Sequence, residues 1–334
     1  MKTVIKTLVY PFIFGFGFIY FLVEKKTLPS AYAGFRHLFV ITNGRSNDFH
    51  SALIRIVKKA KKADKSSGIL GEINQKGLNS MIRSIEQDGF HVFDVSLDAK
   101  LLEELESFAT TTKARYIDLS KTGVNYAAEK ILFDAKNPVS PRYQFDANDV
   151  IKNDAVQSIV FDDNLRMIAS AYLGCPPILD LATMWWSAPF DNKGTDQSAQ
   201  MYHFDMDRFK FLKFFFYLTD VDTNNGPHCY VRNSHKRIPS GVRKDRRISD
   251  EELPKYYKEE DIKEFIGKKG SILAVDTRGL HKGKPLVEGS RLLFQIQFSN
   301  SLFGAPFTKM RIDQPSTEVL EKQKNQPRTY QLFS

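Results

Sequence analysis

The residues of this chain whose types and spacing could do chemistry are two histidines, one aspartate and one arginine. His203 and Asp205 are two positions apart, so on an extended segment both side chains leave the same face and can bind one ion. His281 follows far downstream, and Arg291 comes shortly after it. Two imidazoles and one carboxylate form a three-ligand face for a divalent iron, with positions left open for a co-substrate and oxygen. The arginine would give an anionic co-substrate a guanidinium clamp.

Segments with strand character lie where they could hold these residues together. The aromatic-rich run 209–218 follows the His203 motif and is typical of a long, largely buried strand. It ends in a cluster of turn formers, 219–227, after which 229–231 predicts a short second strand. Residues 270–276 predict another short strand, and His281 lies beyond its far end. Both halves of the expected site are therefore built beside a strand.

The segment 291–298 alternates with period two, as a strand with two different faces does. One face carries Leu292, Phe294, Ile296 and Phe298, and the other carries Arg291, Leu293, Gln295 and Gln297. Polar residues on one face of a strand-rich protein indicate a wet interior pocket. Because Arg291 belongs to that face, we expect the clamp and the metal ligands to share a cavity.

The order of these motifs resembles the phytanoyl-CoA dioxygenase-like branch of the iron(II)- and 2-oxoglutarate-dependent oxygenases. The resemblance covers about residues 85–303, and the combined order is far more specific than any single motif. It rests on Tyr202-His203-Phe204-Asp205, Tyr217 to Asp222, Asn225 to His228, Asn233 to Lys236, His281 with Arg291, and an upstream segment, Asp88 to Phe93, followed by a helical 101–105.

The resemblance implies a mainly β fold with flanking helices, built on a double-stranded β-helix (jelly-roll or cupin-like) core. His203, Asp205 and His281 would bind Fe(II), 2-oxoglutarate would chelate it, and O2 would take the last position. Arg291 would hold the distal carboxylate of 2-oxoglutarate, since a guanidinium is a rigid, permanently charged fork. Such enzymes release succinate and CO2 and usually hydroxylate an unactivated C–H bond. Related halogenases carry a small residue in place of the metal carboxylate, so Asp205 favours hydroxylation over halide transfer.

Each of these residues also has an ordinary structural interpretation. Alone, His203 could be a buried imidazole bonded to a backbone carbonyl, Asp205 could cap a turn, and Arg291 could form a surface ion pair. Their order along the chain favours the site instead. A second function class stays open, a non-catalytic or 2-oxoglutarate-independent metal-binding β-helix protein of the cupin-like kind. The presence of all four residues argues against it, because an inactive scaffold has no physical need for them.

Other polar residues near the motifs are weaker candidates. Lys213 lies inside the aromatic run, where a buried amine is costly unless it meets water or an anion. It could bind the co-substrate or the substrate, or it could extend from an edge strand into water. Gln200 could hydrogen-bond either small molecule, or it could be a solvated loop residue. His228 and His235 are interpreted as turn and strand-end structure rather than as ligands.

Composition limits the class of protein and its partners. The chain has 334 residues and 42% hydrophobic content, enough for one β-rich catalytic domain with additions. Its two cysteines, Cys175 and Cys229, form no spaced framework, which favours a reducing compartment. The net charge is +9, yet no nucleic-acid-binding motif accompanies it, and no nucleic-acid partner is expected. Basic charge instead suits a small or lipid-like substrate that is anionic or linked to a carrier.

The amino terminus predicts contact with a membrane. Residues 7–23 carry no charge and have the minimum length of a membrane-spanning helix. We expect residues 1–26 to form a hydrophobic anchor or an interfacial helix, with a packing helix as the alternative. The basic, mainly helical lead-in at 27–84 would stay on the cytoplasmic side and attract anionic lipids. The catalytic domain is therefore expected at the cytoplasmic face of a membrane.

The rest of the chain divides into a domain and a tail. The oxygenase domain is expected at 85–305, with a charged insertion at 237–265 that could cover the barrel mouth or form a solvated helix. Residues 306–334 are expected to form a polar tail. The identity of the substrate and the oligomeric state stay open at this point, because both depend on loops and surfaces.

Overall fold

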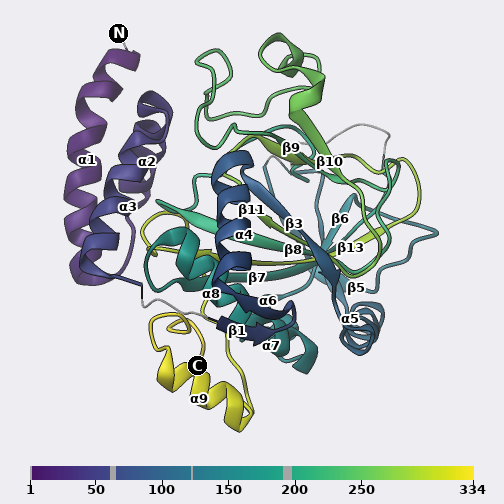
Figure 1. The fold of residues 1–334 in the computed structure, drawn as a ribbon. Coiled ribbons are helices and arrows are strands. Elements are labelled where there is room, and N and C mark those ends of the chain that lie inside the picture. The colour runs from purple at the N-terminus through teal and green to yellow at the C-terminus, as the bar shows by residue number, and fades with distance from the viewer. Residues whose placement is uncertain (1, 61–64, 122, 191–197) are drawn as a thin grey trace.

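Two antiparallel β-sheets form the centre of the molecule (Figure 1). The computed structural model describes residues 2–60, 65–121, 123–190 and 198–334. The larger sheet contains, in spatial order, β3 (Phe90–Ser96), β11 (Ser271–Val275), β8 (Phe211–Tyr217), β13 (Arg291–Ser299), β7 (Ile178–Ser187), β6 (Arg142–Gln144), β4 (Ala114–Ile117) and β5 (Tyr126–Ile131). The smaller sheet contains β10 (Ile262–Phe265), β9 (His228–Val231) and β12 (His281–Gly283).

Helices cover the outer face of the larger sheet. They are α4 (Gln75–Asp88), α5 (Ala99–Thr111), α6 (Ala147–Ile151), α7 (Asp154–Val160) and α8 (Asp163–Leu173), with a hairpin of β1 (Lys65–Gly68) and β2 (Gly71–Asn74) beside α8. The Asp162 side chain accepts a hydrogen bond from the backbone of Leu165 at the start of α8 and another from Ile69 in the hairpin. One carboxylate thus caps a helix and attaches the hairpin to it.

The strands at the centre of the larger sheet are buried on both faces. Phe214 and Phe216 of β8 and Phe294 of β13 pack in the core under the helices. Phe215 and Leu293, one position away, belong to a second cluster that includes Tyr230 of the smaller sheet. The two sheets therefore face each other, and the predicted double-stranded β-helix with flanking helices is confirmed. Burial on both faces explains why the sequence of β8 is apolar without alternation.

A three-helix unit precedes the β-domain: α1 (Lys2–Glu24), α2 (Pro29–Thr42) and α3 (Arg45–Val57). Glycine at Gly17 lets α1 approach α2, because a Cβ there would overlap the side chain of Ala31. Phe14 and Phe35 then pack against Phe209 and Phe303 of the β-domain. The helix α1 continues through Pro11, so the proline and glycines do not interrupt it.

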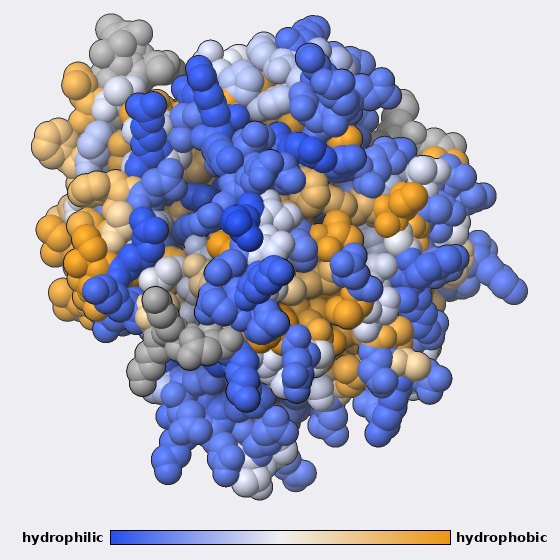
Figure 2. Space-filling model, viewed as in Figure 1, coloured by the Kyte–Doolittle hydropathy of each residue, from blue (hydrophilic) through white to orange (hydrophobic). Residues whose placement is uncertain are grey.

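The opposite face of α1 is apolar and exposed. Phe12 is 80% exposed and Phe16 is 68% exposed, and Leu8, Ile19 and Val23 complete the same stripe. Figure 2 shows this stripe as hydrophobic side chains along the edge of the molecule that α1 occupies in Figure 1. Among the described residues, α1 is the one helix long and apolar enough to cross a membrane, and 17% of its apolar window is buried.

The two segments with the least legible sequence are folded onto the domain. In the insertion 237–265, the helical alternative is wrong: the segment is a chain of turns with two short 3-10 helices, η1 (Leu253–Lys255) and η2 (Glu259–Asp261), before β10. The tail expected to be polar contains α9 (Thr317–Asn325) and buries Met310, Tyr330 and Leu332 in the main core. Apolar residues there are too widely spaced to give a periodic signal.

A buried ion pair fixes the loop that leads from Asp205 into β8. The Arg208 side chain is 2% exposed, and its Nε donates to the Asp180 carboxylate at 2.6 Å. Gln297 of β13 donates to the same carboxylate, while Arg208 Nη1 donates to the carbonyl of Ala305. Arg208 therefore connects this loop to β7 and β13.

Arg208→Met is expected to destabilise the protein by about 3–5 kcal/mol, because it leaves the Asp180 carboxyl group buried without its partner. Chemical denaturation of the full chain measures the free energy of unfolding. The matched control is Arg311→Met, whose arginine side chain is 77% exposed, and this change should stay within about 0.5 kcal/mol. Equal stability of the two variants would contradict the role assigned to the buried pair.

Candidate metal centre and its cavity

A short backbone ladder brings the two halves of the predicted metal site together. The amide of His203 donates to the carbonyl of His281 at 2.9 Å, and the amide of His281 donates back to His203 at 2.8 Å. The amide of Asp205 donates to the carbonyl of Thr277 at 2.8 Å. As a result, one ligand atom from each of His203, Asp205 and His281 lies within 4.8 Å of the others. The structure thus brings together the three residues that the sequence singled out.

Hydrogen bonds select the ring nitrogen that each histidine presents. His203 Nδ1 lies 2.9 Å from the carbonyl oxygen of Met201, and His281 Nδ1 lies 2.9 Å from that of Gly279. A carbonyl only accepts, so Nδ1 carries the proton and Nε2 keeps its lone pair. Both Nε2 atoms face the Asp205 carboxylate, at 3.7 Å for His203 and 3.5 Å for His281. Burial lowers the pKa of both rings, which favours the neutral form that binds a metal ion.

Lys213 contacts the third ligand. Its Nζ lies 2.6 Å from Asp205 Oδ2 and 3.2 Å from Asp207 Oδ2. Burial by itself would raise the pKa of Asp205, but Lys213 and the two histidines hold that pKa well below its ordinary value. Lys213 also lines the adjacent cavity. Its amine therefore neither extends into water from an edge strand nor lies buried without a partner. Asp205 is therefore a carboxylate in the folded protein.

A cavity of about 560 Å³ opens beside the three ligands, and Arg291 lies in its wall. Arg291 is 5% exposed, and Nη2 donates to Ser187 Oγ at 3.3 Å. Its Nε and Nη1 are buried and have no hydrogen-bond partner among the residues that the structure describes. Burial lowers the pKa of Arg291 to about 10, so the group is still charged near neutral pH. Two unused donors on a buried cation fit a carboxylate that comes from a bound molecule.

The remaining candidates lie around this cavity or apart from it. His228 begins β9 as expected, yet its ring also lines the cavity, 5.5 Å from the ring of His281. Trp185 lines the cavity, whereas Trp186 belongs to the main core. Gln200 is only 7% exposed, so the solvated-loop alternative is wrong, and it is absent from the described lining of the cavity. His235 bonds through Nε2 to the carbonyl of Glu86, away from the metal ligands.

Sequence analysis missed one wall of the cavity. Tyr126 of β5, Arg142 and Gln144 of β6, and Thr183 of β7 all line it. The alternation of Arg142, Tyr143 and Gln144 was an available signal, because Tyr143 is buried in the main core while its two neighbours face the cavity. Three residues are too short a run for that pattern to stand out.

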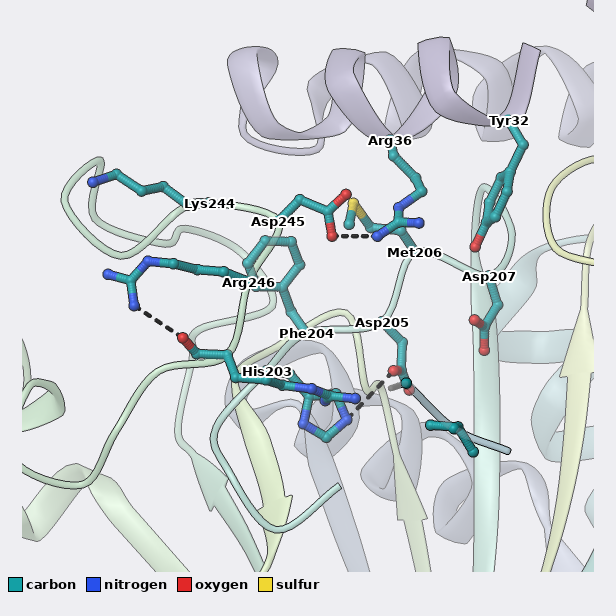
Figure 3. A pocket seen from close by; sticks show the side chains of 13 residues that line it. Tyr32, Arg36, His203, Phe204, Asp205, Met206, Asp207, Lys244, Asp245 and Arg246 are labelled. Atoms are coloured by element: carbon teal, nitrogen blue, oxygen red, sulfur yellow. Dashed lines mark hydrogen bonds and ion pairs between the residues drawn. The ribbon is translucent and has the colours of Figure 1, made fainter. Parts of the chain in front are cut away.

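A second cavity of about 440 Å³ is also lined by His203 and Asp205 (Figure 3). Tyr32 and Arg36 of α2 line it together with residues 244–247 of the insertion. Arg36 pairs with Asp245 across this space. Residues 244–247 of the insertion and the helix α2 therefore both lie beside His203 and Asp205.

Family comparison agrees with the geometry of the site. The model of the family "Phytanoyl-CoA dioxygenase (PhyH)" matches residues 85–291. The chain belongs to the phytanoyl-CoA dioxygenase family. It is therefore a member of the iron- and 2-oxoglutarate-dependent oxygenases, and its donor set fits their cofactors: two neutral imidazoles and a carboxylate for iron, and an unpaired guanidinium for the dicarboxylate.

Solved structures with a similar fold are distant in sequence. The epimerase SnoN from nogalamycin biosynthesis, described as α-ketoglutarate dependent, is 14% identical, with a TM-score of 0.47, covering 67% of this chain and 84% of that one. HygX from Streptomyces hygroscopicus, with nickel, 2-oxoglutarate and hygromycin B bound, is 14% identical, with a TM-score of 0.44, covering 72% and 93%. No curated protein matches the chain significantly in sequence.

The free energy of unfolding of the metal-free protein is expected to fall as the pH drops below about 6.5. Burial lowers the pKa values of His203, His228 and His281, so below that pH the unfolded chain binds protons that the folded chain does not. Each such histidine lowers the free energy of unfolding by about 1.4 kcal/mol per pH unit until the pH reaches the pKa of that histidine in the folded protein. Urea titrations with a chelator present, at a series of pH values, measure this slope.

The variant His228→Phe tests the assignment to individual rings. Phenylalanine preserves the ring contact with Phe215 but does not titrate, so the pH slope of the unfolding free energy should decrease by the contribution of one histidine. An identical slope in the two proteins would show that His228 does not contribute.

Proposed function

We propose that this protein is an Fe(II)- and 2-oxoglutarate-dependent dioxygenase that hydroxylates an unactivated C–H bond of a small or lipid-like organic substrate and releases succinate and CO2. The observation that carries the proposal is that Arg291, a buried arginine with two donors unpaired among the described residues, lines the cavity that His203, Asp205 and His281 also line. One cavity then offers sites for a metal ion and for a dicarboxylate.

The residues have distinct tasks in this proposal. His203, Asp205 and His281 would hold iron, Arg291 would hold the distal carboxylate of 2-oxoglutarate, and the bound pair would supply the oxidising power. The backbone bonds of His203 and His281, together with the bonds of both Nδ1 atoms to carbonyls, orient the rings before any ion binds, which lowers the cost of organising the site. The apolar side chains of Trp185, Phe215 and Leu293 line the same cavity and exclude water from part of it.

The alternative is a metal-binding β-helix protein of the cupin-like kind that does not use 2-oxoglutarate. Such a protein needs the three ligands but not a buried, incompletely bonded arginine, because burial of a charge without a partner is costly. Arg291 is therefore the residue that separates the two functions.

Succinate formation from 2-oxoglutarate, with Fe(II) and ascorbate, tests the proposal directly. The wild-type protein should form succinate even without a substrate, while His203→Ala should lose iron binding and reduce turnover at least about 100-fold. Arg291→Ala should keep iron binding but weaken 2-oxoglutarate binding at least about tenfold, since a charge-assisted pair is lost. The matched controls are His91→Ala on β3 and Arg166→Ala on α8, which lie outside the described lining of the cavity.

The outcomes separate the two functions. Iron binding without succinate formation, unchanged by Arg291→Ala, would support the cupin-like alternative. Equal turnover in the wild type, His203→Ala and Arg291→Ala would end the oxygenase proposal.

We further propose that α1 lies on the cytoplasmic face of a membrane as an interfacial helix. Its inner face is already occupied by packing on α2 and on the β-domain, so crossing the bilayer would require α1 to detach. Its outer stripe is apolar, and the exposed Lys25, Lys26, Lys58 and Lys59 lie at the ends of α1 and α3, where an anionic surface would attract them. This arrangement supports access to a lipid-like substrate.

Co-sedimentation with vesicles of phosphatidylcholine, with and without phosphatidylserine, tests this interfacial helix. The full chain should bind more strongly to the vesicles that contain phosphatidylserine. The double change Phe12→Glu and Phe16→Glu should abolish binding, because both side chains would be charged in the apolar layer. Val287→Glu, at an exposed apolar position elsewhere, is the matched control. Equal binding by the double variant would show that the stripe does not face the membrane.

A further inference from the structure

A second arginine faces the cavity, and the proposed function does not use it. In the larger sheet, Ser187 of β7 pairs with Arg291 on one side and with Arg142 on the other. Arg142 therefore lies two strands from Arg291, and both side chains line the same cavity. Neighbouring strands are about 4.8 Å apart, so the two arginine backbones flank Ser187 across roughly 10 Å of sheet.

The contacts of Arg142 hold its guanidinium in place without neutralising it. The group stacks over the ring of Trp185 at 4.2 Å, and Nη2 donates to Gln144 Oε1 at 2.8 Å. Its Nε is buried without a hydrogen-bond partner among the described residues, and none of their carboxylates lies within 4.0 Å. By contrast, Arg208 and Arg278 are buried against the carboxylates of Asp180 and Asp276.

The carboxylates near Arg142 among the described residues have other partners. Asp205 and Asp207 both pair with Lys213, and a further cation, Arg247, lines the same cavity. Asp146, which also lines the cavity, pairs with Arg115 and Lys130. Arg142 is thus a half-buried cation without a carboxylate partner among the described residues, and it lines a cavity that a bound anion could enter.

We propose that Arg142 recognises an oxyanion group of the substrate, a phosphate or a carboxylate, so that the enzyme acts on an anionic organic molecule. This inference rests on the proposed function, because it assigns Arg291 to 2-oxoglutarate. In that function the Arg291 guanidinium is already occupied by the distal carboxylate of 2-oxoglutarate. Gln144, Tyr126 and Thr183 line the cavity beside Arg142. Tyr126 donates to Gln144 Oε1 and Gln144 Nε2 donates to Thr183 Oγ1, which leaves the Thr183 hydroxyl proton for an oxygen of the anion. The substrate would then extend from the β6 wall toward the metal ligands.

Inorganic phosphate is the probe for this subsite, titrated into the full chain loaded with Ni(II) and saturating 2-oxoglutarate, so that Arg291 is occupied. The wild type should bind phosphate saturably, and Arg142→Gln should weaken that binding at least tenfold, because a charged fork is replaced by a neutral amide. Arg142→Lys, which keeps the charge but loses the fork, should give an intermediate affinity. Arg166→Gln on α8 is the matched control and should bind phosphate like the wild type.

A second measurement separates this inference from the proposed function. Succinate formation without substrate, measured in the wild type, tests the proposed function alone, and a cooperative urea transition of Arg142→Gln shows that the variant is folded. The inference is overturned if the wild type does not bind phosphate, if Arg142→Gln binds it equally well, or if Arg142→Gln loses 2-oxoglutarate binding. Absence of succinate in the wild type would instead end the proposed function and leave the phosphate result to be judged separately.

Discussion

The paired backbone hydrogen bonds between His203 and His281 are the constraint on which the rest of the site depends. The two residues are remote in the sequence. The isolated bridge that joins them lies at the start of β12, a strand of the smaller sheet. Because the bridge fixes both backbones, each ring needs only one further hydrogen bond, from Nδ1 to a nearby carbonyl, to be oriented. The geometry of the ligands is thus set by main-chain bonds, which a change of side chain does not remove.

Charged side chains also hold the site in place, in addition to the backbone hydrogen bonds. Asp205 lies between the two histidines and Lys213, which hold the pKa of its carboxyl group well below the ordinary value despite burial. The loop that follows is held by Arg208, whose buried pair with Asp180 connects it to the larger sheet. The cavity wall formed by β6 and β13 differs, because its cations Arg142 and Arg291 have no carboxylate partners among the described residues. The side of the cavity with Asp205 and Lys213 therefore pairs these charges within the protein. The side with Arg142 and Arg291 can bind the anionic groups of ligands.

The sequence was sufficient to single out the three candidate ligands and the strands beside them, because period-two patterns and a characteristic order of motifs are local signals. It predicted the face of β13 that carries Arg291 and the position of β8. It did not predict Arg142 or Tyr126, which reach the cavity through the pairing of short strands that are distant in sequence. The fold of the C-terminal tail was also missed, because its few buried residues have no period.

The helices at the amino terminus extend from the exposed apolar stripe of α1 to the cavity beside His203 and Asp205. On one side α2 packs against α1, whose outer stripe is apolar, and on the other Tyr32 and Arg36 of α2 line the cavity that reaches His203 and Asp205. Arg36 also pairs with Asp245 in the insertion. A molecule held at the surface beside α1 would therefore meet the mouth of the barrel at α2. An amphipathic substrate, with an apolar part suited to that surface and an anionic group suited to Arg142, satisfies both features of the structure at once.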